Sequence, residues 1–154
     1  GVAEATPFVA TDGAAGAMRA LLLALGVGGP VLVSGASGVG KTAFIRRAAE
    51  IVGQPEPLFL FCDEQTDVKT LLGTYVCGKS VGEFVWRAGL VTEALGQGRW
   101  LVLEDVDRIP AEILAALLPL ADSRRLVLPD RNQRIDAHPH FRLLGTLSTG
   151  AADP

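Results

Sequence analysis

The chain has 154 residues, of which 49% are hydrophobic and 20% charged, and its net charge at pH 7 is -3. These values exclude wholesale disorder and fit one globular domain. The negative charge argues against a nucleic-acid partner held mainly by phosphate neutralisation. Apolar stretches fall short of the roughly 20 residues that span a bilayer, and no charged leader precedes an apolar segment. We therefore expect a soluble domain without an export signal.

Short apolar runs alternate with helical patterns along the chain, after an expected first helix at about 14–25. Parallel strands that are buried on both faces read as continuous apolar runs. The alternation therefore predicts the α/β class, with a parallel sheet flanked by helices. The expected strands are 31–33, 58–62, 100–103 and 141–147, and the expected helices between them are 41–52, 90–95 and 111–121.

Two segments do not fit this alternation, and we predict that each forms a hairpin insertion. Residues 83–87 are bracketed by Gly82 and Gly89, which suggests a short strand or hairpin that projects from the sheet. Later in the chain, 125–128 and 133–136 flank Pro129-Asp130-Arg131-Asn132, whose composition is typical of a turn.

The most specific motif is Gly35-Ala36-Ser37-Gly38-Val39-Gly40-Lys41-Thr42, which satisfies the phosphate-loop pattern G-x-x-x-x-G-K-[ST] at every fixed position. It follows an expected strand and precedes an expected helix, which is the context that this motif requires. The glycines let backbone amides point at phosphate oxygens, and the helix N-terminus favours an anion. Lys41 is expected to reach the β- and γ-phosphates of ATP, and the Thr42 hydroxyl to help hold Mg²⁺. A glycine-rich turn that only caps a helix is the alternative.

An acidic pair, Glu104-Asp105, follows the apolar run 100–103. Ligands of open α/β sheets bind at the carboxyl ends of the strands, where this pair is expected to lie. Acidic residues at that edge can position Mg²⁺ and the water that attacks a phosphate. The alternative is that the pair caps the next helix or is solvated.

The phosphate loop and the acidic strand occur together with three further motifs: Asp63-Glu64-Gln65-Thr66-Asp67, Leu71-Leu72-Gly73-Thr74-Tyr75 and Gly82-Glu83-Phe84-Val85-Trp86-Arg87-Ala88-Gly89. In this combination the chain resembles an AAA+ ATPase module of the dynein-related, MoxR-like branch, over about 31–147. The resemblance implies a P-loop NTPase fold, the AAA+ large subdomain, with ATP and Mg²⁺ as cofactors.

The middle motifs are most similar to those of ring ATPases that carry six such modules in one chain. In the nucleus and nucleolus, these proteins strip assembly factors from precursors of the large ribosomal subunit. The resemblance thus implies that the partners are neighbouring AAA+ modules and preribosomal assembly factors. It also implies that Phe84-Val85-Trp86 belongs to a hairpin that meets neighbours or substrates, although alternating aromatics can equally fill a small satellite core.

The chain departs from this branch in its catalytic residues. The usual order is Asp-Glu, so by position Glu104 takes the metal role and Asp105 the water-activating role. Asp is one methylene shorter than Glu, and misplacement of about 1 Å can cost on the order of 100-fold in rate. Where an Asn usually orients water on the sensor strand, this chain has Ser148, with Thr146 nearby; either hydroxyl is a candidate to bind the γ-phosphate or a water.

The sequence begins at Gly1 and stops at Pro154, directly after the last expected strand, so we expect a partial AAA+ domain without its helical lid. Residues 1–29 are expected to form a linker and helix, and 30–148 the α/β core. The resemblance places the arginine finger and the lid after this segment. Adenine contacts are expected from the segment before the first strand and from that lid.

The remaining charged and titratable residues are less informative. Arg124 and Arg125 precede the sensor strand and are expected at the surface or at a hairpin base. His138 and His140 have no nucleophile partner, so no hydrolase triad is predicted. Cys62 and Cys77 lack metal-ligand spacing and are too few for a disulfide framework, so we expect reduced thiols.

The leading hypothesis is an ATP-hydrolysing module of a ring. Three alternatives to this hypothesis stay open. A nucleotide-binding module that does not hydrolyse ATP is compatible with the inverted acidic pair. A different ring ATPase of the same branch, such as a MoxR-type chaperone for metal-cofactor assembly, is a second alternative, but Gln65-Thr66-Asp67 and Leu103-Glu104-Asp105 argue against it. A small-molecule kinase would need an acceptor site and a mobile lid, for which the sequence shows no signature.

Overall fold

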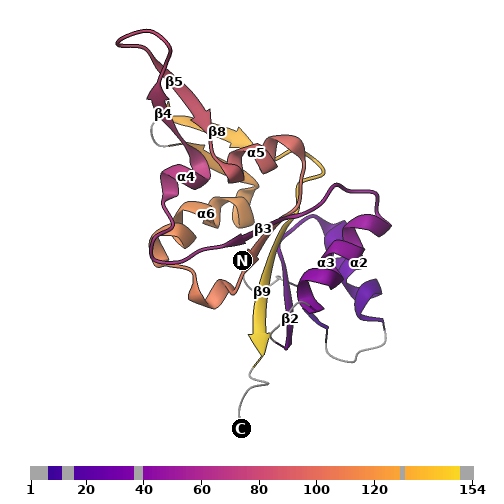
Figure 1. Ribbon diagram of the computed structural model, residues 1–154. Coiled ribbons are helices and arrows are strands. Elements are labelled where there is room, and N and C mark those ends of the chain that lie inside the picture. Colours follow the sequence, from indigo (N-terminus) through magenta and orange to yellow (C-terminus); the bar gives the residue numbers. More distant parts are fainter. Residues whose placement is uncertain (1–6, 12–15, 37–39, 129–130, 150–154) are drawn as a thin grey trace.

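The computed structural model describes residues 7–11, 16–36, 40–128 and 131–149. Its centre is a five-stranded parallel sheet in the order β1-β2-β9-β6-β3 (Figure 1). The strands are Phe8–Ala10 (β1), Val31–Ala36 (β2), Leu58–Phe61 (β3), Leu101–Glu104 (β6) and Leu143–Thr149 (β9). The predicted α/β class and the four predicted strands are confirmed, whereas β1 was not predicted.

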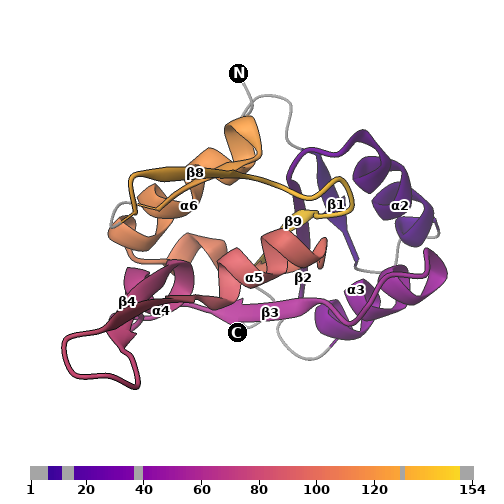
Figure 2. The ribbon, with the colours of Figure 1, turned by 90° about the horizontal axis from the view of Figure 1, so that it is seen from above.

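Helices cover both faces of the sheet (Figure 2). Ala17–Val27 (α2) and Gly40–Ile51 (α3) pack on one face, and Val68–Leu72 (α4), Leu90–Gln97 (α5) and Ala111–Ser123 (α6) pack on the other. Four of these helices were predicted to within a few residues at each end. Helix α4 was not, because its 5 residues are too few to show a helical period.

The interior strand β6, which lies between β9 and β3, shows why the sequence folds into three layers. Successive side chains of a strand point to opposite faces. Leu101 and Leu103 accordingly join the apolar cluster under α4, α5 and α6, whereas Val102 joins the cluster under α2 and α3. All three side chains are at most 4% exposed, so both faces of this strand are buried.

Strand β9, the last strand of the sheet in the sequence, starts later than predicted. The expected strand began at 141, but β9 begins at Leu143. Phe141 lies in a turn in which its backbone N–H donates to the carbonyl of His138, and its side chain is fully buried. An apolar residue that fills the core from a turn looks the same in sequence as the first residue of a strand.

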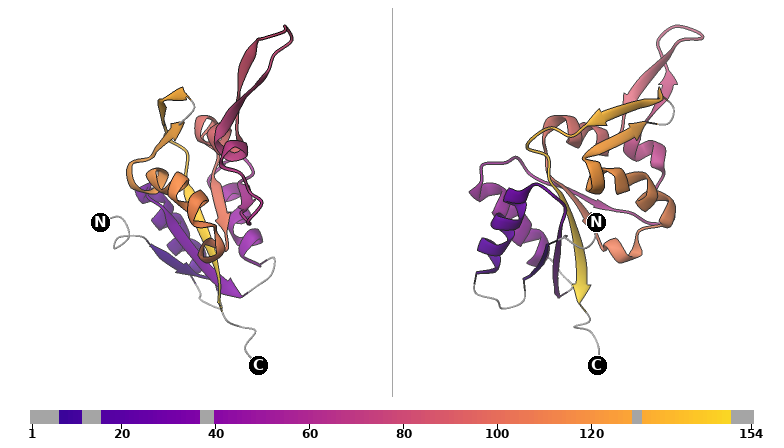
Figure 3. Two further views of the ribbon diagram at one scale, coloured as in Figure 1. Left: turned by 90° about the vertical axis from the view of Figure 1, so that its left-hand side faces the viewer. Right: turned by 180° about the vertical axis from the view of Figure 1, so that it is seen from behind.

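Two antiparallel hairpins extend from the core, as predicted (Figure 3). The first pairs Gly73–Cys77 (β4) with Phe84–Ala88 (β5), and the second pairs Arg125–Leu128 (β7) with Gln133–Asp136 (β8). At the base of the first hairpin Gly73 has φ 129°, and a Cβ there would lie 2.4 Å from the Trp86 ring. Only a glycine can adopt this positive φ and also leave room for the Trp86 ring beside its Cα. Of the predicted turn in the second hairpin, Pro129 and Asp130 lie outside the described residues.

Within the described ranges, no helix is both long and apolar enough to cross a membrane. Cys62 is buried and Cys77 is exposed, and both are free thiols, as predicted.

Candidate functional site

The phosphate loop lies between the end of β2 and the start of α3, at the carboxyl edge of the sheet. Gly35 and Ala36 are the last residues of β2, and Gly40 is the first residue of α3. The predicted strand–loop–helix context is therefore present. Ser37, Gly38 and Val39, which were also expected to cradle phosphate, lie outside the described residues.

Lys41 is a buried cation at the centre of this edge, with only 6% of its surface exposed. Its ammonium donates to the carbonyl oxygens of Gly35 and Ala36, at 3.0 and 2.8 Å, and to the Oγ of Ser148 at 3.3 Å. An ammonium has three N–H donors, so these bonds satisfy it completely. The side chain is thus held at the mouth of the loop by the backbone of β2 and by the sensor strand.

The first acid of the pair faces the start of α3. Glu104 is the last residue of β6, and its Oε1 lies 3.5 Å from the Thr42 hydroxyl, which donates to it. A hydroxyl and a carboxylate are the hard oxygen ligands that Mg²⁺ prefers, usually together with waters. The two residues predicted to hold the metal therefore lie together, and their donor set fits Mg²⁺.

The second acid lies in the turn after β6. Asp105 has φ 50° and ψ 60°, in the left-handed region, and the short helix η1 (Val106–Arg108) follows it. Its backbone N–H donates to the Thr146 hydroxyl at 3.0 Å, and its Oδ1 accepts from Ser148 Oγ at 3.2 Å. The carboxylate is thereby linked through Ser148 to the Lys41 ammonium.

The two hydroxyls of the sensor strand have different surroundings. Ser148 lies at the exposed end of β9, between Lys41 and Asp105. Thr146 is only 4% exposed, and its hydroxyl accepts from the Asp105 backbone. That either hydroxyl binds the γ-phosphate or a water stays a prediction, but the Thr146 hydroxyl is already engaged with the acidic residue Asp105. Its contact with the acidic turn could not be seen in the sequence, because it depends on β9 lying beside β6.

The first hairpin divides its aromatic residues between two roles. Trp86 is half-buried and packs against the core. Its ring makes an edge-to-face contact with that of Tyr75, its partner on the neighbouring strand, at 5.3 Å between ring centroids. The Arg131 guanidinium lies over the Trp86 ring. Phe84 is 66% exposed on the projecting arm. The small-core interpretation thus holds for Trp86, whereas Phe84 is free to meet a partner.

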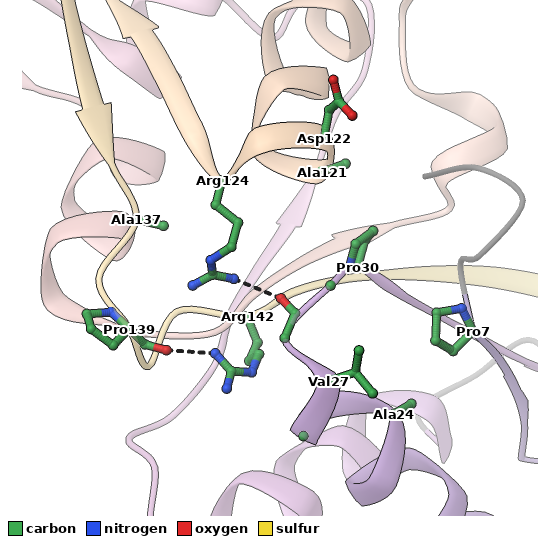
Figure 4. Close-up of a pocket in the computed structure, with 13 residues that line it drawn as sticks. Pro7, Ala24, Val27, Pro30, Ala121, Asp122, Arg124, Ala137, Pro139 and Arg142 are labelled. Carbon is green, nitrogen blue, oxygen red and sulfur yellow. Dashed lines mark hydrogen bonds between the residues drawn. The ribbon is translucent and has the colours of Figure 1, made fainter. Parts of the chain in front are cut away.

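Two arginines close the opposite, amino edge of the sheet around a cavity of about 540 Å³ (Figure 4). Arg124 donates to the carbonyls of Gly28, His138 and Phe141, and Arg142 to those of Leu25, Pro139 and Phe141. Burial, together with the nearby Arg142, lowers the pKa of the Arg124 guanidinium. Arg124 therefore lies at a hairpin base, as predicted, but it also binds the loop before β2 and the loop before β9.

The chain belongs to the AAA family: residues 30–152 match the AAA domain of the dynein-related subfamily. Over 129 residues it is 40% identical to midasin of Dictyostelium discoideum, a match that covers 84% of this chain and 2% of that protein. It is 30% identical over 145 residues to midasin of Giardia intestinalis, covering 94% of this chain and 3% of that protein. The resemblance predicted from the sequence is confirmed.

Bacterial proteins of the same branch are similar as well. Protein NorQ of Paracoccus denitrificans is 33% identical over 123 residues, which cover 79% of this chain and 44% of NorQ. A solved structure described as a candidate ATPase from Cytophaga hutchinsonii superposes on this chain with a TM-score of 0.60 at 20% identity. The superposition covers 88% of this chain and 38% of that chain, and it supports the fold. The chain spans less than half the length of each of these proteins.

Proposed function

We propose that this chain is an ATP-hydrolysing module of a ring-shaped AAA+ remodelling ATPase, in which nucleotide turnover drives movement. The observation that carries the proposal is the meeting of Lys41, Glu104, Asp105 and Ser148 at one edge of the sheet, from three separate elements. A site that only bound Mg²⁺-nucleotide would need the phosphate loop and Glu104, but not Asp105 beside them.

Each residue has a distinct role in this proposal. When nucleotide binds, the Lys41 ammonium gives up its hydrogen bond to a backbone carbonyl of β2 and donates to phosphate oxygens. Its positive charge then offsets the negative charge of the phosphates. Thr42 and Glu104 would hold Mg²⁺, partly through water, and a metal bound there would supply positive charge that offsets the charge developing in phosphoryl transfer. Asp105 orients the attacking water and takes up its proton, while Ser148 fixes the carboxylate. The loop amides cradle the phosphates.

The test of hydrolysis is single-turnover conversion of ATP to ADP in the full-length protein with Mg²⁺. We expect Asp105→Asn to keep ATP binding and lose turnover by about 100-fold or more, because it removes the base. Lys41→Ala is the control, because turnover that remains in this variant comes from other sites and is subtracted. Tight binding in the wild type without turnover would contradict the proposal and support the non-hydrolysing module, which the inverted acidic order also favours.

We further propose that the ring acts in the nucleus on precursors of the large ribosomal subunit, with preribosomal assembly factors and neighbouring AAA+ modules as partners. The 40% identity to midasin of Dictyostelium discoideum supports this proposal, whereas the 33% identity to NorQ supports the alternative of a MoxR-type chaperone. The exposed Phe84, on the arm that projects from the core, is a candidate contact residue.

The test of the cellular role is affinity purification of the full-length protein from its own cells, with the Phe84→Ala variant in parallel. Recovery of large-subunit precursors, weakened in the variant, is expected. Recovery of a metal-cofactor enzyme in their place would contradict the ribosomal role and favour the chaperone.

A further inference from the structure

The backbone at Asp105 adopts a conformation that few side chains favour. It is one of three non-glycine residues with positive φ in the described part of the chain. In the left-handed region an L side chain crowds the following carbonyl, and Asp and Asn enter it more readily than longer residues. The Glu104-Asp105 order therefore suits this turn, because the residue in the left-handed position is the shorter acid.

A left-handed residue persists only where its surroundings hold it. Leu103 of β6 pairs with Gly145 of β9, and two residues further along the chain the Asp105 backbone N–H donates to Thr146 Oγ1 at 3.0 Å. Thr146 lies in register with Val33 of β2 on its other side and is 4% exposed. The backbone of Thr146 is thus held in place by its pairing with β2, independently of the contact with Asp105.

Gly145 brings the acidic turn close to β9. A Cβ at this position would lie 2.7 Å from Val106 Cγ1, which is closer than packed atoms approach. The absence of a side chain at Gly145 allows η1 to lie against the strand, and Thr146 then bonds to the residue that begins this turn. Two successive residues of β9 therefore fix where the turn after β6 lies.

We propose that Thr146 is a positioning residue, whose hydroxyl holds Asp105 in the left-handed conformation that places its carboxylate beside Ser148. The proposal rests on the hydrolytic function proposed above, since positioning matters for catalysis only if Asp105 acts on water. Thr146 does not touch the nucleotide in this arrangement. It acts through the backbone of Asp105, whereas Ser148 acts on the carboxylate.

Two substitutions separate the hydroxyl from the shape of the side chain. Thr146→Val keeps the branched shape and removes the hydroxyl, whereas Thr146→Ser keeps the hydroxyl and removes a methyl. The first readout is the hydrogen-exchange rate of the Asp105 amide without nucleotide. We expect exchange to be about 10-fold faster or more in Thr146→Val and close to wild type in Thr146→Ser, because only the former loses the acceptor.

The second readout is the affinity for Mg²⁺-ATP together with the single-turnover rate. In Thr146→Val the dissociation constant is expected within about 3-fold of wild type, with turnover lowered about 10-fold, the loss of one hydrogen bond. Thr146→Ser is expected to restore turnover. If Thr146→Val keeps wild-type exchange or turnover, or if both variants lose turnover equally, the proposal is overturned. A wild type that never hydrolyses ATP overturns the proposed function, and the exchange rates still judge the contact between Thr146 and Asp105.

Discussion

The ammonium of Lys41 and the hydroxyl of Ser148 lie 3.3 Å apart, although 107 residues separate them in the chain. The same hydroxyl donates to Asp105 at 3.2 Å. One hydroxyl can accept and donate at once, so both contacts form together. They are possible because β9 lies between β2, which leads to Lys41, and β6, which leads to Asp105. A cation and an acid of the candidate site are thus joined through a neutral residue.

Replacing Ser148 with alanine removes this link. We expect Ser148→Ala to lower single turnover about 10-fold, the cost of one hydrogen bond to a charged group, while Mg²⁺-ATP affinity changes by less than about 3-fold. Rapid-quench measurement of ADP formation checks the rate, and titration calorimetry checks the affinity. Unchanged turnover would show that Ser148 is only the polar end of a strand.

The two aromatic residues of the first hairpin should differ in their contribution to stability. Trp86→Ala removes a half-buried ring from the core and is expected to lower the free energy of unfolding by about 2 kcal/mol, less than for a fully buried aromatic. Phe84→Ala changes an exposed position and is expected to cost less than about 0.5 kcal/mol. Urea unfolding of the two variants, followed by circular dichroism, measures both values. Equal losses would contradict the division of roles between them.

Arg124 and Arg125 are neighbours in the sequence, but Arg124 is bound to backbone carbonyls, whereas Arg125 makes an exposed ion pair. Arg124→Ala leaves the carbonyls of Gly28, His138 and Phe141 without this donor, and we expect a loss of about 2 kcal/mol of stability. Arg125→Ala breaks an exposed ion pair with Asp136 and is expected to cost less than about 1 kcal/mol. Thermal unfolding of both variants decides this prediction, which fails if Arg125→Ala is the more damaging change.

The two thiols should react at very different rates. Cys77 is exposed, whereas burial, with Asp63 nearby, raises the pKa of the Cys62 thiol. At pH 8 we expect a thiol reagent to label Cys77 rapidly and Cys62 only on unfolding, because the thiolate is the reactive form. Mass spectrometry of the labelled peptides checks this order, and rapid labelling of Cys62 in the folded chain would contradict it.

The raised pKa of Cys62 also has a consequence for stability. The folded chain holds this proton more tightly than the unfolded chain does. The free energy of unfolding should therefore fall as the pH rises above about 8.5, where the unfolded thiol loses its proton. Chemical unfolding at pH 7 and pH 10 measures the fall, which should be smaller in Cys62→Ala. An equal fall in both proteins would rule out Cys62 as its source.

The core of the sheet could be predicted because its strands are buried on both faces and read as apolar runs. Strands β7 and β8 were predicted with their observed bounds, since a turn composition lies between two alternating segments. Strand β1 could not be predicted, because its three residues show no period and are ordered by pairing with β2. Short elements of this kind depend on partners that are distant in sequence.

The candidate site also has parts that could be predicted from the sequence and parts that could not. The phosphate loop and Glu104-Asp105 are contiguous motifs, so their chemistry can be inferred from residue types alone. The roles of Ser148 and Thr146 depend on the strand order and on the positive φ at Asp105, neither of which has a local signature. The three carbonyls that Arg124 contacts come from two loops distant from it in sequence, so the sequence indicated only a hairpin base.

The central claim is that Lys41 and its loop form a nucleotide site, and the most direct test is calorimetric titration of Mg²⁺-ATP into the wild type, Lys41→Ala and Asp105→Asn. Asp105→Asn is the matched control, because it changes the same edge of the sheet without touching the loop. The account predicts binding by the wild type and by Asp105→Asn, and its loss in a Lys41→Ala variant whose circular dichroism shows that it is still folded. Equal binding by the wild type and Lys41→Ala, or no binding by the folded wild type, would contradict it.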